Sequence, residues 1–336
     1  MIRGTYVIKR LVAAVLSLFG VATIAFVLFR IVPGDPARLM TAPGIKAEDI
    51  ERLRASLGLS DPLHIQYVNW LSGLMHLDFG RSYWLKAPAL DVILERLPAT
   101  LELVFASIII ATVLGVIIGV VSVMKAGRLS DKVATSASFI GFSIPDFLWG
   151  VLFVIIFGGL LKLLPVSGRI DPAISLKPVT NFMVIDSILQ VNFIALQSSL
   201  THLLLPSLAL ALGLIAIIHR TLRSSLLDIL QEDYILTDRS KGLPEWYIFF
   251  VRAFKNGALP VLTIIGVQIS FVIGGSVIIE LIYGWPGIGT LSLISVNRRD
   301  LPVVQGIIVI YSLITIIINL AVDFLYTKLN PKITYG

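Results

Sequence analysis

Long apolar runs alternate with shorter polar segments along this chain. The runs occupy residues 11–29, 101–123, 134–164, 203–218, 261–282 and 303–326. An α-helix of about 20 apolar residues crosses a hydrocarbon core roughly 30 Å thick, and it leaves no backbone group unpaired in lipid. The pattern predicts an all-α polytopic membrane protein with six transmembrane helices, in a single transmembrane domain that covers residues 1–336.

The third run is long enough for a span plus a helical extension, whereas the fourth is short. The first run follows Arg3, Lys9 and Arg10, which resemble the charged head of a signal peptide. Because the run is long and lacks an Ala-x-Ala cleavage site, we interpret it as an uncleaved first helix.

Composition narrows the class of protein. Of the 336 residues, 56% are apolar and only 14% are charged, whereas globular domains average about 25% charged residues. An ordinary soluble enzyme is therefore excluded. Cysteine is absent, the four histidines have no ligand-like spacing, and no Gly-x-x-x-x-Gly-Lys-Ser/Thr phosphate loop occurs. We expect no catalytic residue, no metal and no cofactor, so any ATP that drives this protein is bound by another chain.

The basic residues indicate the orientation. With the N-terminus inside, the inside segments hold Arg3, Lys9, Arg10, Lys125, Arg128, Lys132, Arg220, Arg223, Arg239, Lys241, Arg252, Lys255, Lys328 and Lys332. The shorter outside loops hold only Lys162, Arg169, Lys177, Arg298 and Arg299. By the positive-inside rule, both termini and the loop 219–258 are expected to be cytoplasmic, and the segment 31–98 extracytoplasmic. The net charge of +6 is then a topology signal, and no nucleic-acid partner is expected.

Short amphipathic patterns outside the long runs predict further helices. The extracytoplasmic segment opens with the turn-forming residues 33–36 and then shows helical apolar spacing over 48–57 and again over 65–77. Residues 182–190 form another short helix candidate in the second outside loop.

The loop 219–258 carries the most informative polar pattern. A segment that begins at Glu232 ends with Arg239 and Lys241, and this order of charges favours a helix through its macrodipole. Gly242 can adopt the left-handed conformation that closes such a helix. The helix that follows is expected to be amphipathic, with an apolar face made of Trp246, Phe249, Phe250, Ala253 and Phe254.

Four carboxylates lie in or near the apolar runs: Glu102, Asp146, Glu280 and Asp323. A carboxylate left in lipid costs about 2.5 kcal/mol or more, so each one is a functional hypothesis. Two interpretations stay open. The carboxylates either pair with nearby groups at the ends of the spans, or line a route through the membrane. Asp146 follows Pro145, where we expect a break in the helix.

Several motifs in order along the chain resemble those of one family, the inner-membrane permease subunits of ATP-binding-cassette importers in the dipeptide and oligopeptide branch. The loop motif is Tyr234-Ile235, Thr237-Asp238-Arg239-Ser240-Lys241-Gly242-Leu243 and Leu259-Pro260. The other matching segments lie at residues 33–36, 97–103, 142–145, 165–169, 205–206, 285–289, 302–306 and 319–323. One departure is Asp238, which stands where the family usually has Ala.

The resemblance implies a permease with the type I importer fold that translocates dipeptides or short oligopeptides across the bacterial cytoplasmic membrane. It implies a homologous second permease, two cytoplasmic ATPase subunits and an extracytoplasmic substrate-binding protein as partners, besides the lipid bilayer. It also implies that the loop docks onto an ATPase through residues Asp233, Tyr234, Thr237, Asp238, Arg239, Lys241 and Gly242.

Two alternatives remain beside this reading. Sister branches of the same importers carry nickel chelates, glutathione, haem or antimicrobial peptides. An ion-coupled secondary transporter or channel would need ionisable groups or broken helices at mid-membrane, and it would leave the loop motif unexplained.

Overall fold

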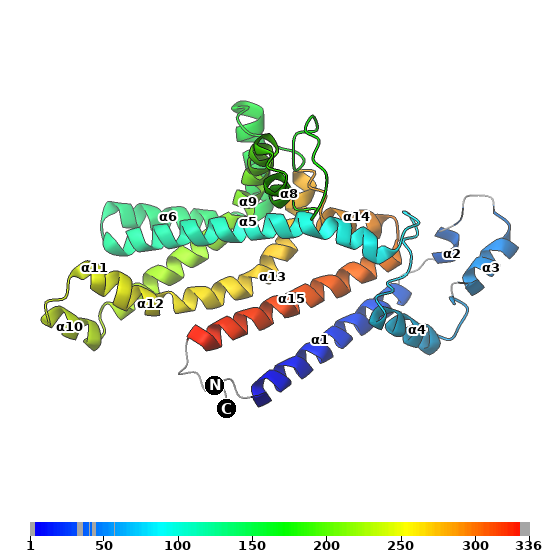
Figure 1. Cartoon of the computed structure of the whole chain (residues 1–336), viewed down its shortest axis with the longest axis horizontal. Helices are drawn as coiled ribbons and strands as arrows, with labels where there is room; N and C mark the ends of the chain where they lie inside the picture. Colours follow the sequence, from blue (N-terminus) through cyan, green and yellow to red (C-terminus); the bar gives the residue numbers. More distant parts are fainter. Residues whose placement is uncertain (1–3, 32–35, 40, 42–44, 57, 330–336) are drawn as a thin grey trace. The chain divides into compact units, whose positions relative to one another are not determined.

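The computed structural model describes residues 4–31, 36–39, 41, 45–56 and 58–329, and the described chain is almost entirely helical (Figure 1). The α-helices are α1 Gly4–Ile31, α2 Pro36–Leu39, α3 Ala47–Ser56, α4 Leu63–Met75, α5 Ala89–Met124, α6 Leu129–Ser143, α7 Asp146–Phe153, α8 Met183–Leu189, α9 Phe193–Ile229, α10 Asp233–Ser240, α11 Glu245–Tyr247, α12 Phe254–Gly257, α13 Leu259–Ile282, α14 Ile288–Asn297 and α15 Leu301–Leu329. Two π-helical stretches, η1 Val154–Leu160 and η2 Ile248–Ala253, continue α7 and α11.

Five helices in the described part of the chain are long and apolar enough to cross a membrane, and a bent pair makes a sixth candidate. They are Ile8–Leu28, Ala89–Met124, Phe193–Ile229, Leu259–Ile282 and Leu301–Val322, with Leu129–Ser143 plus Asp146–Leu160 as the bent pair. The short helices expected over 48–57, 65–77 and 182–190 are present as α3, α4 and α8.

The third apolar run forms two helices, with a bend of 100° between them, and not one straight helix. Pro145 has no N–H to donate, and it pushes the residue before it out of the helical region. Ile144 accordingly has an extended backbone with φ −94° and ψ 125°, and Pro145 precedes the restart as the N-cap of α7. The break lies where the proline predicts it.

The helices α5 and α9 extend well beyond their apolar runs. The run at 203–218 forms the middle of a 37-residue helix, and the run at 101–123 forms the end of a 36-residue helix. Hydropathy detects only the segment that suits hydrocarbon, whereas backbone hydrogen bonding continues through polar turns at either end.

The chain divides into two compact units, residues 1–98 with 286–317 and residues 99–285 with 318–336. In the first unit a buried apolar cluster joins α1, α5, α14 and α15 through Ala22, Phe79, Ala89, Val92, Ile93, Ile288, Leu291, Val303, Ile307, Val309 and Ile310. Its polar anchor is Asp300, 1% exposed. The carboxylate of Asp300 accepts hydrogen bonds from Ser82 Oγ at 2.5 Å and Tyr83 N at 2.9 Å.

The second unit is built around α9, which packs against α6, α7, α8, α12 and α13. Glycines allow neighbouring helices to approach closely. A Cβ at Gly115 of α5 would lie 2.7 Å from Ile218, and a Cβ at Gly257 would lie 2.5 Å from Leu226. Such distances are too short for real contacts, so these glycines set how closely α5 and α12 approach α9.

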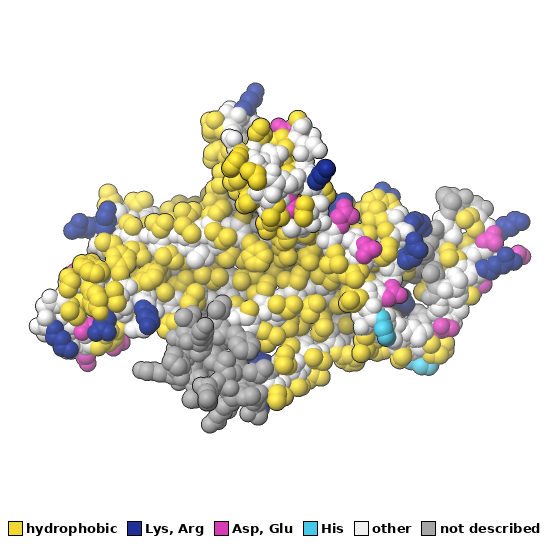
Figure 2. Space-filling model, viewed as in Figure 1, with side chains coloured by type: hydrophobic (Ala, Val, Ile, Leu, Met, Phe, Trp, Pro, Cys, Tyr) yellow, Lys and Arg dark blue, Asp and Glu magenta, His cyan; other side chains and the backbone are white. Residues whose placement is uncertain are grey.

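Apolar side chains cover most of the face shown in Figure 2, and charged side chains gather over α10 and α11 and over the segment of α3 and α4. Many large apolar side chains are exposed on the long helices, such as Ile109, Phe271 and Ile317 at 62%, 69% and 55%. Such surfaces suit contact with lipid or with other membrane helices.

Candidate functional site

The helix predicted in the loop 219–258 is present and ends as expected. α10 begins after Glu232, and Gly242 has φ +77°, in the left-handed region. The Gly242 N–H donates to Arg239 O at 2.9 Å, and the Leu243 N–H donates to Asp238 O at 3.3 Å. These two bonds satisfy carbonyls that the end of a helix leaves open. A Cβ at Gly242 would meet nothing within 4 Å, so the backbone conformation, and not crowding within the chain, requires glycine here.

α10 turns one side toward its own chain and leaves the other open. Ile235 is fully buried and Asp238 is 6% exposed. Asp238 forms an ion pair of 3.1 Å with Arg252 of η2. The other residues proposed for coupling are exposed: Asp233, Tyr234, Thr237, Arg239, Lys241 and Gly242. Asp238 therefore belongs to the packed side of α10, and the open side carries the rest of the motif.

Two of the exposed residues have side-chain contacts with residues that follow α10. Arg239 donates to both carboxylate oxygens of Glu245, at 2.8 and 3.2 Å. This guanidinium holds the pKa of the Glu245 carboxyl below its usual value. Tyr234 accepts a hydrogen bond of 3.2 Å from Asn256 Nδ2. The contacts join α10 to the helices that follow it.

The apolar face expected after Pro244 is only partly correct. Trp246 and Phe250 are 63% and 49% exposed, whereas Ile248 and Ala253 are fully buried. The reason is the π-helical stretch Ile248–Ala253. In a π turn the hydrogen bond joins residues i and i+5, so each turn holds about one residue more than an α-helical turn. A prediction based on α-helical spacing therefore assigns the wrong residues to the buried face. Two aromatic side chains are left on the surface beside α10.

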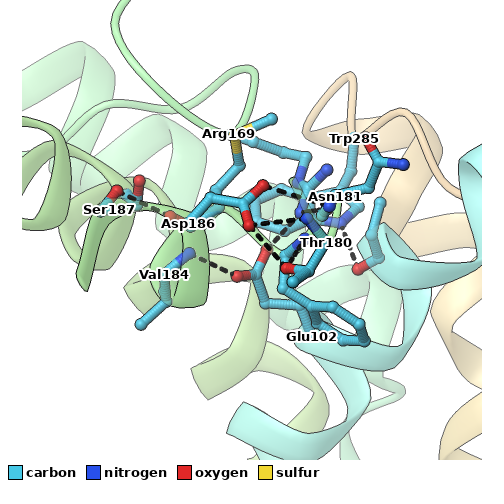
Figure 3. A network of polar contacts seen from close by, with 12 residues as sticks. Glu102, Arg169, Thr180, Asn181, Val184, Asp186, Ser187 and Trp285 are labelled. Carbon is cyan, nitrogen blue, oxygen red and sulfur yellow. Dashed lines mark hydrogen bonds and ion pairs between the residues drawn. The ribbon is translucent and has the colours of Figure 1, made fainter. Parts of the chain in front are cut away.

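Glu102 is held in a buried ion pair (Figure 3). Arg169 Nη2 lies 2.5 Å from Glu102 Oε2, both side chains are 7% exposed, and the Val184 N–H donates to Glu102 Oε1 at 2.8 Å. Arg169 also donates to Asn181 O at 2.8 Å and lies over the Trp285 ring. This pair joins α5 to the loop that carries α8, so pairing is the interpretation that the geometry of Glu102 favours.

Next to this pair, Asp186 organises the loop before α8 (Figure 3). Its buried carboxylate accepts backbone N–H bonds from Val179, Thr180 and Asn181 at 3.1, 2.8 and 3.1 Å, and a bond from the Thr180 hydroxyl at 2.6 Å. Burial alone would raise the pKa of Asp186, but these hydrogen bonds outweigh it and lower the pKa below its usual value. Sequence reasoning had not singled out Asp186.

Glu280 is also enclosed. It is fully buried, and Thr100 Oγ1 donates to its Oε1 at 2.6 Å. The neighbouring Trp285 donates from its ring to Ala99 O at 2.8 Å. Glu280 thereby joins α13 to α5. The side chain of Asp323 lies outside the described residues.

Asp146 differs from the other carboxylates. It is half-buried at the start of α7, directly after the break in the bent pair. Positions for a Cβ at Gly213 of α9 and Gly275 of α13 lie 3.4 and 3.6 Å from its carboxylate oxygens. In the part of the chain that the structure describes, no hydrogen bond or ion pair reaches this carboxylate. The Asp146 carboxylate therefore lies beside two glycines and has no polar partner among the described residues.

Sequence reasoning missed a second ion pair, in which the carboxylate is buried. Arg223 of α9 donates to both oxygens of Asp131 of α6, at 2.7 Å each, and Ser122 of α5 donates to the same carboxylate. Asp131 is 3% exposed. The partners are far apart in sequence, and no local spacing indicates that they meet.

The chain matches two parts of one family description. Residues 94–335 match the binding-protein-dependent transport system inner membrane component, and residues 1–104 match the N-terminal part of the same membrane component. The match therefore extends over almost the whole sequence.

Curated relatives match at similar lengths. The di/tripeptide transport system permease protein DppB of Pseudomonas aeruginosa is 36% identical over 98% of this chain and 99% of the relative. The dipeptide transport system permease protein DppB of Escherichia coli is 36% identical over 98% of each. The glutathione transport system permease protein GsiC of Escherichia coli is 35% identical over 98% and 99%.

Solved structures share the fold at low identity. A membrane chain from inward-facing MetNI, a methionine ABC transporter, has a TM-score of 0.54 and 15% identity, and covers 71% of this chain and 96% of its own length. A chain from an amino acid ABC transporter crystallised with histidines has a TM-score of 0.50 and 16% identity, over 71% and 94%. These likenesses show a fold common to importer permeases.

Proposed function

We propose a function from the premise that this chain belongs to the family of binding-protein-dependent transport system inner membrane components. It is a multi-pass inner-membrane permease of the importer class. We propose that its cargo is dipeptides and other short peptides. The observation that carries this is the 36% identity, over nearly the full length of both chains, to permeases named for di- and tripeptide transport.

A glutathione permease is almost as similar, at 35% identity. Glutathione is itself a modified tripeptide, so the two candidates share a backbone and two charged ends. The second candidate cargo for this chain is therefore glutathione, and the two differ in the length and linkage of the peptide accepted.

We propose that this permease functions with a homologous second permease, two cytoplasmic ATPase subunits that hydrolyse the ATP, and an extracytoplasmic binding protein. The chain has no phosphate-binding loop of its own. The open side of α10 supports docking of an ATPase there, because exposed motif residues lie beside the exposed rings of Trp246 and Phe250. Exposed aromatic residues are enriched at protein interfaces.

The packing of the loop supports a mechanical role. Asp238 and Arg252 join α10 to η2, η2 continues into α12, and α12 packs against α9 and α13. Gly257 lets α12 approach Leu226 of α9 closely. A push on α10 would therefore pass through packed helices to two spans, which is how a rigid-body movement couples distant sites.

We propose Asp146 as the carboxylate that lines the route for the cargo. Glu102 and Glu280 have polar partners, whereas Asp146 lies beside Gly213 and Gly275 with no polar partner among the described residues. An intramembrane carboxylate left open is expensive unless it serves a ligand. A peptide's N-terminal ammonium is the complementary charge. Replacing Asp146→Asn is expected to lower uptake, with Asp91→Asn, an exposed aspartate on α5, as the control.

Measurements of uptake into cells test which cargo this permease transports. Cells that lack other peptide importers, and that express this chain with its partner subunits, are given di- to pentapeptides, glutathione and nickel chelates. We expect the cells to accumulate short peptides, and we expect different short peptides to compete with one another for uptake. Uptake of glutathione or a nickel chelate without any unmodified peptide would contradict the peptide assignment. Purification without an ATPase would contradict the proposed partners.

A further inference from the structure

The first unit contains a polar cavity that holds none of the four carboxylates considered above. It has a volume of about 440 Å³ and is lined by residues from the end of α1, from α4, from the segment 78–83 and from the start of α15. We call it the α1/α4 cavity. Its volume lies within the roughly 300–1,000 Å³ typical of small-molecule sites.

Three side chains of this cavity carry a buried polar atom that has no hydrogen-bond partner among the described residues. The atoms are Arg30 Nε, Gln66 Oε1 and Gln305 Nε2. Gln305 is only 6% exposed. Buried polar groups are hydrogen-bonded in the great majority of cases, so three unpartnered polar atoms around one cavity suit a polar ligand.

The orientation of Gln66 is fixed by its own contacts. Gln66 Nε2 donates to Leu59 O at 3.1 Å and to Asp61 O at 2.7 Å. The amide oxygen is therefore the atom left over, and it can only accept. The α1/α4 cavity thus presents a cationic donor from Arg30, an amide from Gln305 and one acceptor from Gln66.

The charge of the cavity favours an anion. The Arg30 guanidinium lies 4.8 Å over the Phe26 ring. Burial lowers the pKa of Arg30. The lining also holds Arg81, whose Nη2 donates to Lys86 O, and Asp78, whose Oδ1 accepts from Gly80 N, so two cationic side chains stand against one carboxylate.

We propose that the α1/α4 cavity binds the C-terminal carboxylate of a short peptide, with Arg30 and Gln305 donating to the carboxylate and Gln66 accepting the N–H of the last peptide bond. The last residue of a peptide presents an anion and an N–H donor on one carbon, which matches two donors and one acceptor. A lipid phosphodiester matches the donors but brings no donor on an adjacent atom. The proposal rests on the proposed function, in which peptides are the cargo. It adds that the permease recognises the C-terminal end of the peptide.

The test uses the complete permease complex in lipid nanodiscs, without the binding protein, and isothermal titration calorimetry. The probes are alanyl-alanine, alanyl-alanine amide, which has no C-terminal charge, and glycerol phosphate as a lipid headgroup mimic. Alanyl-alanine is expected to bind the wild-type complex about tenfold or more tightly than its amide, because hydrogen bonds to a charged group are lost. This comparison needs no variant and so does not depend on folding.

Variants locate the binding. Gln305→Glu places a carboxylate opposite the ligand's own and is expected to abolish binding, and Arg30→Gln is expected to weaken it about tenfold or more. Gln231→Glu makes the same change at an exposed position outside the cavity and should bind as wild type does.

Equal binding of the dipeptide and its amide would overturn the proposal, as would binding of glycerol phosphate alone or of no probe. Dipeptide binding that Gln305→Glu and Arg30→Gln leave unchanged would overturn it too. Uptake of peptides with no binding in the cavity would leave the transport function intact and refute only this site. Uptake of nickel chelates alone would instead refute the peptide function.

Discussion

Gly242 combines a helix stop with an open surface. Its φ of +77° is in a region that costs a residue with a Cβ about 1–2 kcal/mol. Because no atom of the chain crowds the position, a side chain there would also project toward whatever docks on α10. The neighbouring ion pair of Arg239 and Glu245 is exposed and is worth little by comparison.

We predict that Gly242→Leu abolishes uptake and peptide-stimulated ATP hydrolysis, whereas Arg239→Ala or Lys241→Ala weakens both less. Gly127 offers a matched control, because it also has φ +77° with no atom near a Cβ, but lies outside the loop 219–258. Gly127→Leu should retain coupling despite the same backbone strain. Wild-type uptake and hydrolysis in Gly242→Leu would show that α10 is not the coupling element.

Asp186 is a residue whose ionisation stabilises one loop. Its pKa is lowered in the folded chain below the reference value of 3.8. The carboxylate therefore stabilises the fold at every pH above that reference, and this contribution disappears as the pH falls through the folded pKa.

We predict that Asp186→Asn lowers the melting temperature of the purified complex at pH 7, by the equivalent of about 1–3 kcal/mol for charged hydrogen bonds. The difference between the variant and wild type should shrink as the pH is lowered below 3.8. Thermal unfolding followed from pH 7 to pH 3 measures it. A difference that stays constant across this range would mean that Asp186 acts without its charge.

At the scale of elements, glycines determine which helices touch. Gly115 of α5 faces Ile218 of α9, and no other residue type leaves that separation intact. Two further devices shape the second unit: the break at Pro145 and the π turn of η2, which rotates the buried face of the loop.

We predict that Gly115→Ala destabilises the complex, because the new Cβ would lie 2.7 Å from Ile218 Cγ2. Gly20 of α1 is the matched control, since a Cβ there meets nothing within 4 Å. Alanine favours helices over glycine by about 1 kcal/mol, so Gly20→Ala should be neutral or stabilising. Melting temperatures in the same detergent compare them, and equal effects would refute the role of close packing.

For the whole molecule, the orientation of the chain in the membrane remains a prediction from its basic residues. The chain contains no cysteine, so single cysteines can be labelled selectively. Four exposed serines sample both sides: Ser56 and Ser167 on the predicted outside, Ser130 and Ser240 on the predicted inside.

We predict that an impermeant thiol reagent labels cysteine at Ser56 and Ser167 in intact cells, and at Ser130 and Ser240 only after the membrane is opened. The reason is the excess of Lys and Arg in the loops that contain Ser130 and Ser240. The reverse pattern in intact cells would place both termini outside and invert the docking side of α10.

The sequence by itself determined the class, the spans and the loop motif of this protein. Apolar runs follow from the thickness of a bilayer, Pro145 from the chemistry of the peptide bond, and the end of α10 from the conformational freedom of Gly242. These are local rules, so the residues concerned carry the information themselves.

Only the tertiary structure decided what the carboxylates do. Glu102 meets Arg169, Asp131 meets Arg223 and Asp238 meets Arg252. Each pair is brought together by tertiary packing, and the sequence separations follow no period. Packing likewise left Asp146 half-buried beside two glycines and gathered Arg30, Gln66 and Gln305 around one cavity. The sequence shows which charged residues the protein has. The energy of each charge depends on the groups within a few ångströms of it, and those neighbours are determined only when the chain folds.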